Sequence, residues 1–220
     1  MPIEVVVELE GVNLGILEMD GVSVVPSAAA LSDEILRLCE EINRNVTIEQ
    51  VSERDSVRAV RAMFRAWGID PARYRPSSEA LLRRIAQGKG LYRISNVVDA
   101  GNLGSLEAGW SYGIYDRDLI SPPVVFREGQ TSESYEGIGK QTWHLAGRPV
   151  LADQNGAFGS PISDSTRSMV TEAAHNLLAV IYAPSSATAS VIESALQKLS
   201  ERITQSGGGS AVYLCIVPHK

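Results

Sequence analysis

The sequence predicts an α+β fold. Segments with helical periodicity and segments typical of strands both occur, but they do not alternate regularly as βαβ units would. The chain has 220 residues, of which 44% are hydrophobic and 21% are charged, the balance of a globular protein that can bury a substantial core. We therefore expect one domain over residues 1–220, to which residues 1–50 add an N-terminal extension of strands and a helix packed on the rest.

The N-terminal segment 3–25, "IEVVVELEGVNLGILEMDGVSVV", is typical of two or three short strands joined at glycines. The next segment, 26–45, predicts a helix, because apolar residues recur three or four positions apart. These residues are Leu31, Ile35, Leu38 and Ile42.

Two further helices follow. Thr47 and Gln50 have capping-box spacing and predict a helix start. The apolar stripe of this helix is Val57, Val60, Phe64 and Trp67, and Gly68 marks its end. Pro76 and Ser77 predict the start of a third helix, with Ser77 as its N-cap and Glu79 in its first turn. Gly88 and Gly90 are expected to end it.

The rest of the chain is rich in glycine and in short segments typical of strands, such as "PPVVFRE", "TWHLAG" and "RPVLADQNG". "NLLAVIYAP", at 176–184, predicts a buried strand. Residues 185–203 predict a helix with Val191, Ala195, Leu199 and Ile203 on its apolar face. "SGGGSAVYLCIVP", at 206–218, predicts a loop and a last strand.

Several classes of protein are excluded on sequence grounds. Cys39 and Cys215 stand alone, so we expect neither disulfides nor a zinc site, and a reducing cytoplasm is the natural location. The apolar runs are too short to span a bilayer and the N-terminus does not resemble a signal peptide, so no membrane partner is expected. Motifs for nucleotide binding, metalloprotease and serine hydrolase chemistry are missing, and the three histidines lack metal-ligand spacing. We expect no cofactor and no metal.

Charge is distributed unevenly along the chain. The net charge of -6 argues against a protein that coats nucleic acid by bulk electrostatics, and we expect no DNA partner. Residues 58–93, however, carry nine Lys or Arg against Asp70 and Glu79, a local balance of +7. Arginines flank the start of the third helix, at Arg73, Arg75, Arg83 and Arg84. This cluster, and the stripe of Arg54, Arg58, Arg61 and Arg65, is either an anion-binding surface or a solvated basic face.

Two polar clusters are candidates for a site. Asn96, Asp99, Asn102 and Ser105 recur every three residues and would share one face of a helix, able to hold the hydroxyl and amine groups of a small ligand. The alternative is a solvent face. The second cluster is "SPISDSTRS", with Ser163, Asp164, Ser165, Thr166 and Arg167. It is either a ligand-binding loop or a plain turn.

Four blocks, in this order, resemble the B3/B4 domain of the phenylalanyl-tRNA synthetase beta subunit, in a free-standing form. They are "RPSSEALLRRI", "ISNVVDAGNLGSLEAG", "YGIYDRDLI" and "VLADQNGAFGSPISD", and the resemblance covers residues 57–183. It implies a layered fold with mixed or antiparallel sheets flanked by helices. It also implies an amino-acid-sized cleft that samples the acyl end of aminoacyl-tRNA. The partners implied are a tRNA acceptor end or aminoacyl-tRNA and an aromatic amino acid. A chain of this length has no room for the aminoacylating module, so we expect no tRNA charging.

The sequence also departs from the family pattern. In the bacterial family a histidine stands three residues before the aspartate that matches Asp116, and here that position is Gly113. The family's pocket glutamate has no counterpart, because no glutamate lies between Glu136 and Glu172. Asn102 matches the family asparagine, whereas the threonine beside it becomes Gly101. The resemblance therefore implies a retained pocket whose chemistry is altered or lost.

Two functional hypotheses follow. In the first, the protein hydrolyses mischarged aminoacyl-tRNA in trans: Asp164 positions water, and Asn102 or a backbone amide near Gly101 polarises the carbonyl. The substrate-binding residues would be Asn96, Asp99, Ser105, Tyr112, Ser163, Ser165 and Arg167, and the RNA-binding residues Arg75, Arg83 and Arg84. In the second, the domain is a non-catalytic module that binds RNA, an amino acid or a protein.

Two carboxylates carry specific expectations. We expect Asp164 to be ionised, with its pKa held down by neighbouring hydroxyls and Arg167. Its role is either catalytic or a structural cap of its own loop. Glu79 is expected to hold a neighbouring arginine.

Overall fold

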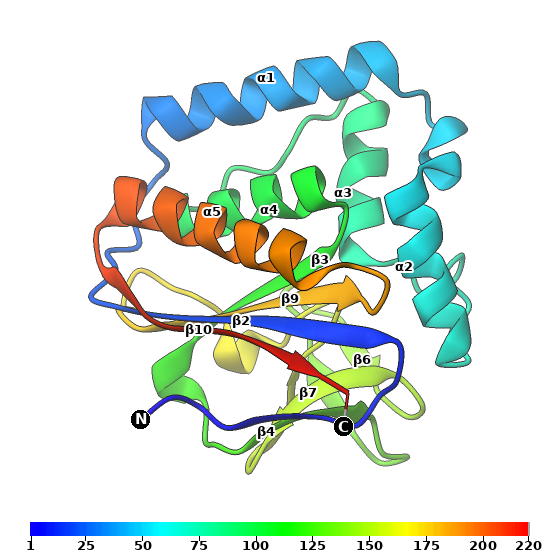
Figure 1. The fold of residues 1–220 in the computed structure, drawn as a ribbon, viewed down its shortest axis with the longest axis vertical. Coiled ribbons are helices and arrows are strands. Elements are labelled where there is room, and N and C mark those ends of the chain that lie inside the picture. The colour runs from blue at the N-terminus through cyan, green and yellow to red at the C-terminus, as the bar shows by residue number, and fades with distance from the viewer. Residues whose placement is uncertain (220) are drawn as a thin grey trace.

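The computed structural model describes residues 1–219, which form layers of helices and sheets (Figure 1). Helices α4 and α5 cover one face of a central sheet, α1 lies above them, and the second sheet lies on the other side of the central sheet (Figure 1). A single large apolar core runs between these layers. Among the described residues, no helix has both the length and the apolar character needed to cross a membrane.

The central sheet is antiparallel and has the strand order β10-β2-β9-β3. Its strands are β2 (Val12–Asp20), β3 (Ser111–Asp116), β9 (Leu177–Pro184) and β10 (Ser210–Pro218). Every residue of β9 is buried, which explains its continuous run of apolar side chains. The N-terminal strand β2 lies between β9 and β10, so this part of the first 50 residues is built into the central sheet and does not simply pack on its outside.

The second sheet is mixed and has the order β1-β4-β7-β8, because β1 runs parallel to β4 whereas the other pairs are antiparallel. Its strands are β1 (Val5–Val7), β4 (Val124–Glu128), β7 (Pro149–Asp153) and β8 (Gly156–Gly159). Strands β5 (Ser134–Glu136) and β6 (Thr142–His144) form a separate ribbon. The predicted α+β class with mixed and antiparallel sheets is confirmed.

The α-helices of the described chain are α1 (Ala29–Asn45), α2 (Asp55–Ala66), α3 (Ser77–Ala86), α4 (Asn96–Ala108) and α5 (Ala189–Gly207). Three short 3-10 turns lie in the connections: η1 (Gln50–Glu53) between α1 and α2, η2 (Arg117–Leu119) between β3 and β4, and η3 (Thr166–Ser168) between β8 and β9.

Several local predictions need correction. Thr47 and Gln50 make the reciprocal capping-box bonds, but these open the turn η1, and α2 begins only at Asp55. Ser77 is the first residue of α3 and not its N-cap; Pro76 takes that position. The buried face of α1 contains Cys39 where Leu38 was expected.

The apolar stripe of α5 is also shifted. Val191 is 52% exposed, and the buried side chains are Ile192, Leu196, Leu199 and Ile203. The two turns nearest the N-terminus of the helix therefore bury residues one position later than the near-heptad spacing indicated.

Candidate functional site

A cavity of about 330 Å³ lies between α3, α4, β3 and the loop 160–170. This volume falls within the range of small-molecule sites. The wall is largely apolar and aliphatic, and includes Ile94, Val98, Ile114, Ile162, Met169 and Val170. We call it the apolar cavity. At its mouth, the side chains of Tyr92, Ile94 and Ile138 are about half exposed or more.

Five of the predicted site residues meet at the apolar cavity. Asn102 and Ser105 reach it from α4, Tyr112 from β3, and Ser163 and Asp164 from the loop 160–170. Gly101, beside Asn102, packs so closely on Ile114 that a methyl group at residue 101 would collide with the end of that side chain. The glycine therefore lets α4 approach β3 along this wall.

Asn96 and Asp99 do not line the cavity, so the expectation that they share one ligand-binding face is wrong. Asn96 is fully buried, accepts from the Val25 amide and donates to the Ser23 carbonyl. Asp99 accepts from Ser27 Oγ at 2.6 Å and from the Ile94 amide. The reason is geometric: a three-residue spacing lags one helical turn by about 60° at each step, so the first and last members of the series lie on opposite faces.

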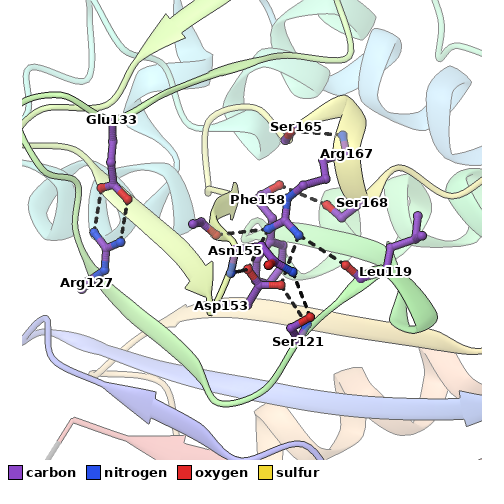
Figure 2. A network of polar contacts seen from close by, with 11 residues as sticks. Leu119, Ser121, Arg127, Glu133, Asp153, Asn155, Phe158, Ser165, Arg167 and Ser168 are labelled. Atoms are coloured by element: carbon purple, nitrogen blue, oxygen red, sulfur yellow. Dashed lines mark hydrogen bonds and ion pairs between the residues drawn. The ribbon is translucent and has the colours of Figure 1, made fainter.

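Ser165 and Arg167 also lie away from the apolar cavity. Arg167 makes a bidentate ion pair with Asp153, at 2.9 and 3.1 Å, and donates to the carbonyls of Leu119 and Gly156 (Figure 2). Ser165 accepts from the Arg167 amide at the start of η3. Arg167 thus joins η3 to β7 and β8, and Arg127 and Glu133 form a similar bidentate pair nearby (Figure 2).

Asp164 has surroundings that differ from those expected. Its Oδ1 accepts from Tyr115 Oη at 2.8 Å and from the Ser160 amide at 3.1 Å. Burial raises the pKa of Asp164 to about 6, against the lowering effect of these two bonds. The predicted depression of the pKa by Arg167 is therefore wrong, because Arg167 pairs with Asp153. Asp164 is still largely ionised at pH 7, as expected.

The second oxygen of Asp164 is available to a ligand. No group within residues 1–219 donates a hydrogen bond to Oδ2, whereas Oδ1 has two donors. Asp164 lines the apolar cavity, and Oδ2 is the oxygen of its carboxylate that is not already occupied by donors from the described residues.

The partners of Asp164 were not found in the sequence. Tyr115 and Tyr182 are fully buried, and their hydroxyl oxygens lie 3.0 Å apart. The sequence did contain one signal that Gly113 and Tyr115 are neighbours: they are two residues apart and so lie on the same face of a strand. Nothing local links either tyrosine to Asp164.

The arginine cluster is organised around Glu79, whose side chain is 1% exposed. Glu79 accepts from Arg61 at 2.7 Å and from Arg83 at 2.6 Å, and Arg75 lies at 3.8 Å. Burial acts to raise the pKa of Glu79, but the bonds from Arg61 and Arg83 outweigh it and leave this pKa below its ordinary value. The expectation that Glu79 holds a neighbouring arginine is confirmed, and Arg83 is largely committed to this internal pair.

Beside the cluster lies a second hollow of about 290 Å³, which we call the basic hollow. It is lined by Arg75, Arg83, Arg84 and Lys89, and it shares Ala80, Leu81 and Tyr92 with the apolar cavity. The Arg84 guanidinium lies 3.8 Å from the centre of the Tyr92 ring. Tyr92 is therefore a common wall, with cationic groups on one side and aliphatic groups on the other.

The described residues contain no group of three or more His, Cys, Asp and Glu side chains arranged to hold a metal ion. The polar groups that line the apolar cavity and the basic hollow include the Asp164 carboxylate, the Asn102 amide, hydroxyl groups and arginines.

The layered sheets and the cavity beside α4 place the protein among α+β domains that contain a ligand-sized cleft. More specifically, the chain belongs to the B3/4 domain family, whose sequence model matches residues 59–207.

Individual proteins support this assignment. The phenylalanine–tRNA ligase beta subunit of Neisseria gonorrhoeae is 31% identical over 103 residues, which cover 42% of this chain and 13% of that subunit. The same subunit of Neisseria meningitidis serogroup B is 28% identical over 116 residues, which cover 48% of this chain and 15% of the relative. The match thus spans only a small part of these relatives.

Among solved structures, the chain is similar to an N-terminal fragment of the phenylalanyl-tRNA synthetase beta subunit from Pyrococcus horikoshii. The TM-score is 0.51 and the sequence identity is 16%, over 99% of this chain and 55% of that one. At this identity the likeness concerns the fold alone.

Proposed function

We propose that this domain binds the aminoacylated 3′ end of a tRNA and hydrolyses the ester of a mischarged amino acid in trans. The observation that carries the proposal is the shared wall between the two hollows. The apolar cavity, with Asp164 Oδ2 available, adjoins a basic hollow through Ala80, Leu81 and Tyr92. An aminoacyl ester on a nucleotide has the matching groups: an apolar side chain, an ammonium group and a neighbouring phosphate.

The amino acid fits the apolar cavity by its chemistry. The aliphatic wall favours an apolar or aromatic side chain, because such a ligand loses contact with water there. Asp164 Oδ2 then attracts either the ammonium group of the ligand or a water molecule. Either role requires the ionised carboxylate, which predominates at pH 7 because the pKa is about 6.

The RNA end fits the basic hollow. Arg75 has a side chain that is 44% exposed, and Lys89 is exposed at the end of α3. Both can meet a phosphate, whereas Arg83 is held by Glu79. Such contacts position an RNA backbone without reading its sequence.

Hydrolysis needs little from the protein. An ester is cleaved when a water is oriented towards the carbonyl carbon and the developing oxyanion is stabilised. Asp164 is our candidate to orient the water, and Asn102, which lines the same cavity, to polarise the carbonyl oxygen. A ribose hydroxyl of the substrate can handle the proton.

The test measures the rate at which the aminoacyl ester is hydrolysed on phenylalanine tRNA that is charged with tyrosine or with phenylalanine. We expect the wild-type protein to accelerate loss of one ester over the protein-free rate. Asp164→Asn should reduce the acceleration about a hundredfold or more. Asp33→Asn, which removes an exposed carboxylate from α1, is the matched control and should act as wild type. An Asp164→Asn protein as active as Asp33→Asn would contradict the catalytic role.

A second candidate function is binding without hydrolysis, and one observation favours it. A side chain at Gly113 would overlap the Tyr115 hydroxyl, so the position that matches the family histidine has no room for one. Binding that discriminates charged from uncharged tRNA, without ester loss, would establish this alternative.

A further inference from the structure

Behind Asp164, two buried tyrosines from adjacent strands form a chain of hydroxyl groups. Tyr115 comes from β3 and Tyr182 from β9, and both rings are fully buried. Tyr115 Oη lies 2.8 Å from Asp164 Oδ1 and 3.0 Å from Tyr182 Oη. A phenol carries one proton and an ionised carboxylate can only accept, so Tyr115 donates to Asp164 and accepts from Tyr182. The chain of donors thus ends on the carboxylate.

The fold reserves space for this chain. A methyl group at Gly113 or at Gly159 would overlap the Tyr115 hydroxyl, so the phenol lies between two positions that must lack a side chain. Phe158 packs edge-on against the Tyr115 ring, with the centroids 5.0 Å apart. A tyrosine serving only as an apolar core residue would not require both glycines around its polar end.

The two carboxylate oxygens of Asp164 differ in their hydrogen bonds. The Tyr115 hydroxyl and the Ser160 amide both donate to Oδ1, from β3 and from the end of β8. Oδ1 is thus occupied by two donors, whereas Oδ2 has none among the described residues and remains for a molecule in the cavity that Asp164 lines.

We propose that Tyr115, supported by Tyr182, is a positioning residue that keeps Asp164 charged and directs its Oδ2 towards the ligand. This inference rests on the proposed function, in which Asp164 meets an ammonium group or a water. In an apolar wall a carboxylate tends to take up a proton, and a buried donor aimed at it opposes that tendency. Tyr115 would therefore act through Asp164 and not on the ligand itself.

The titratable groups around the carboxylate are three tyrosines: Tyr115 on β3, Tyr182 on β9 and Tyr135 on β5. Burial raises the pKa of each phenol above its ordinary value, so all three stay neutral at pH 7 and below. The charge of Arg148 acts on Tyr135. The Tyr135 hydroxyl donates to the Ser163 carbonyl and not to Asp164, which makes Tyr135 a matched control.

The experiment measures the titration of the Asp164 carboxyl carbon by NMR in the ligand-free protein, with the signal assigned by its loss in Asp164→Asn. Tyr115→Phe should move the midpoint upwards by about one pH unit, because one of two stabilising donors is lost. Tyr182→Phe should move it in the same direction by less, since it acts through Tyr115. Tyr135→Phe should leave the midpoint unchanged.

A second measurement connects this titration to ligand binding. The affinity of the wild-type protein for phenylalanine methyl ester should rise as the pH increases to about 6, where Asp164 ionises while the ammonium group of the ester is still protonated. At pH 6, Tyr115→Phe should bind the ester about fivefold more weakly, in line with the smaller ionised fraction.

The outcomes separate this inference from the proposed function. A Tyr115→Phe protein with a lower melting temperature but an unmoved Asp164 midpoint would give the tyrosine a structural role only and overturn the inference. If Tyr115→Phe does not fold, the Tyr182→Phe midpoint decides in the same way. A wild-type protein that binds no ester, while the midpoint still moves, would count against the proposed function and leave the positioning of the charge established.

Discussion

At the scale of single residues, the burial of Asp164 links its ionisation to the stability of the fold. Its pKa of about 6 in the folded protein lies above the value of 3.8 for an unperturbed aspartate. The folded state therefore holds a proton more tightly than the unfolded state, and stability falls as the pH rises from about 4 through 6. We therefore expect the ionised carboxylate to destabilise the fold at neutral pH relative to its protonated form.

Asp164→Asn should therefore stabilise the protein above pH 6. The Asn amide oxygen can accept the bonds that Tyr115 and Ser160 now donate to Oδ1, and no charge is buried. We expect a gain of at most ~3 kcal/mol at pH 8, and little difference from wild type at pH 4, where Asp164 is protonated. Urea denaturation at both pH values measures this gain. An equal effect at pH 4 and pH 8 would show that the charge is not its cause.

Gly113 supports a second prediction at this scale. Gly113→Ala should lower the free energy of unfolding by about 1–3 kcal/mol, because the new methyl group overlaps the Tyr115 hydroxyl within a packed core. Gly139→Ala is the control, since its added methyl group meets no atom within 4 Å. Thermal denaturation of the two variants compares them directly. Equal melting temperatures would mean that Tyr115 can move aside at little cost.

At the scale of elements, local patterns in the sequence predicted where most helices and strands lie and most of the buried residues of α1 and α2, but not the buried face of α4. The capping box at Thr47 forms as expected, because its bonds join residues three apart. The polar series on α4 was misleading for two reasons. Its spacing does not match the helical repeat, and the side chain of Asn96 hydrogen-bonds to the backbone of residues far away in the sequence. Asn102 and Asp164 could be named as candidates, whereas their common cavity depends on contacts far apart in sequence.

Helix α3 is fixed to α2 by the ion pairs of Glu79, and this gives the third prediction. Glu79→Gln should destabilise the protein by about 3–5 kcal/mol at pH 7, since Arg61 and Arg83 would lose their buried counter-charge. Because the pKa of Glu79 is depressed, its stabilising effect is present above the unfolded pKa and is lost as the pH falls through the folded pKa. The free energy of unfolding lost in Glu79→Gln should therefore be smaller at acid pH.

The control is Asp55→Asn, which removes an exposed i,i+3 pair with Arg58. Such surface pairs contribute little, so we expect less than about 1 kcal/mol. Chemical denaturation of both variants at pH 7 and in acid makes the comparison. If Glu79→Gln were as stable as Asp55→Asn, the arginine cluster would not depend on its buried carboxylate.

At the scale of the whole molecule, the sheet order could not be read from the sequence. Strand β2, near the N-terminus, pairs with β9 and β10, which are more than 150 residues away along the chain. The local charge surplus of residues 58–93 was visible in the sequence. How these cations divide between internal ion pairs and exposed groups could not be predicted, because Arg61 and Arg83 reach Glu79 from two different helices. Arg75, which is 44% exposed and lies 3.8 Å from Glu79 without a hydrogen bond to it, and the exposed Lys89 remain open to an external anion.

The division of the cations between internal ion pairs and exposed groups predicts how tRNA binding depends on salt concentration. We expect weak, strongly salt-dependent binding to tRNA, with the exposed cations of the basic hollow contributing to the slope of log K against log salt concentration. Arg75→Gln and Lys89→Gln should each reduce the magnitude of that slope by about 0.7, because each removes one phosphate contact to a single-stranded end.

Arg58→Gln, on the exposed face of α2, removes the same charge away from the hollow and should leave the slope nearly unchanged. Arg83→Gln is not a clean probe, since it also breaks the pair with Glu79. Filter binding of labelled tRNA over a series of salt concentrations measures all four slopes. Equal reductions for Arg58→Gln and Arg75→Gln would mean that RNA responds to the diffuse positive field of this region, and the basic hollow would then have no specific role in binding the phosphate.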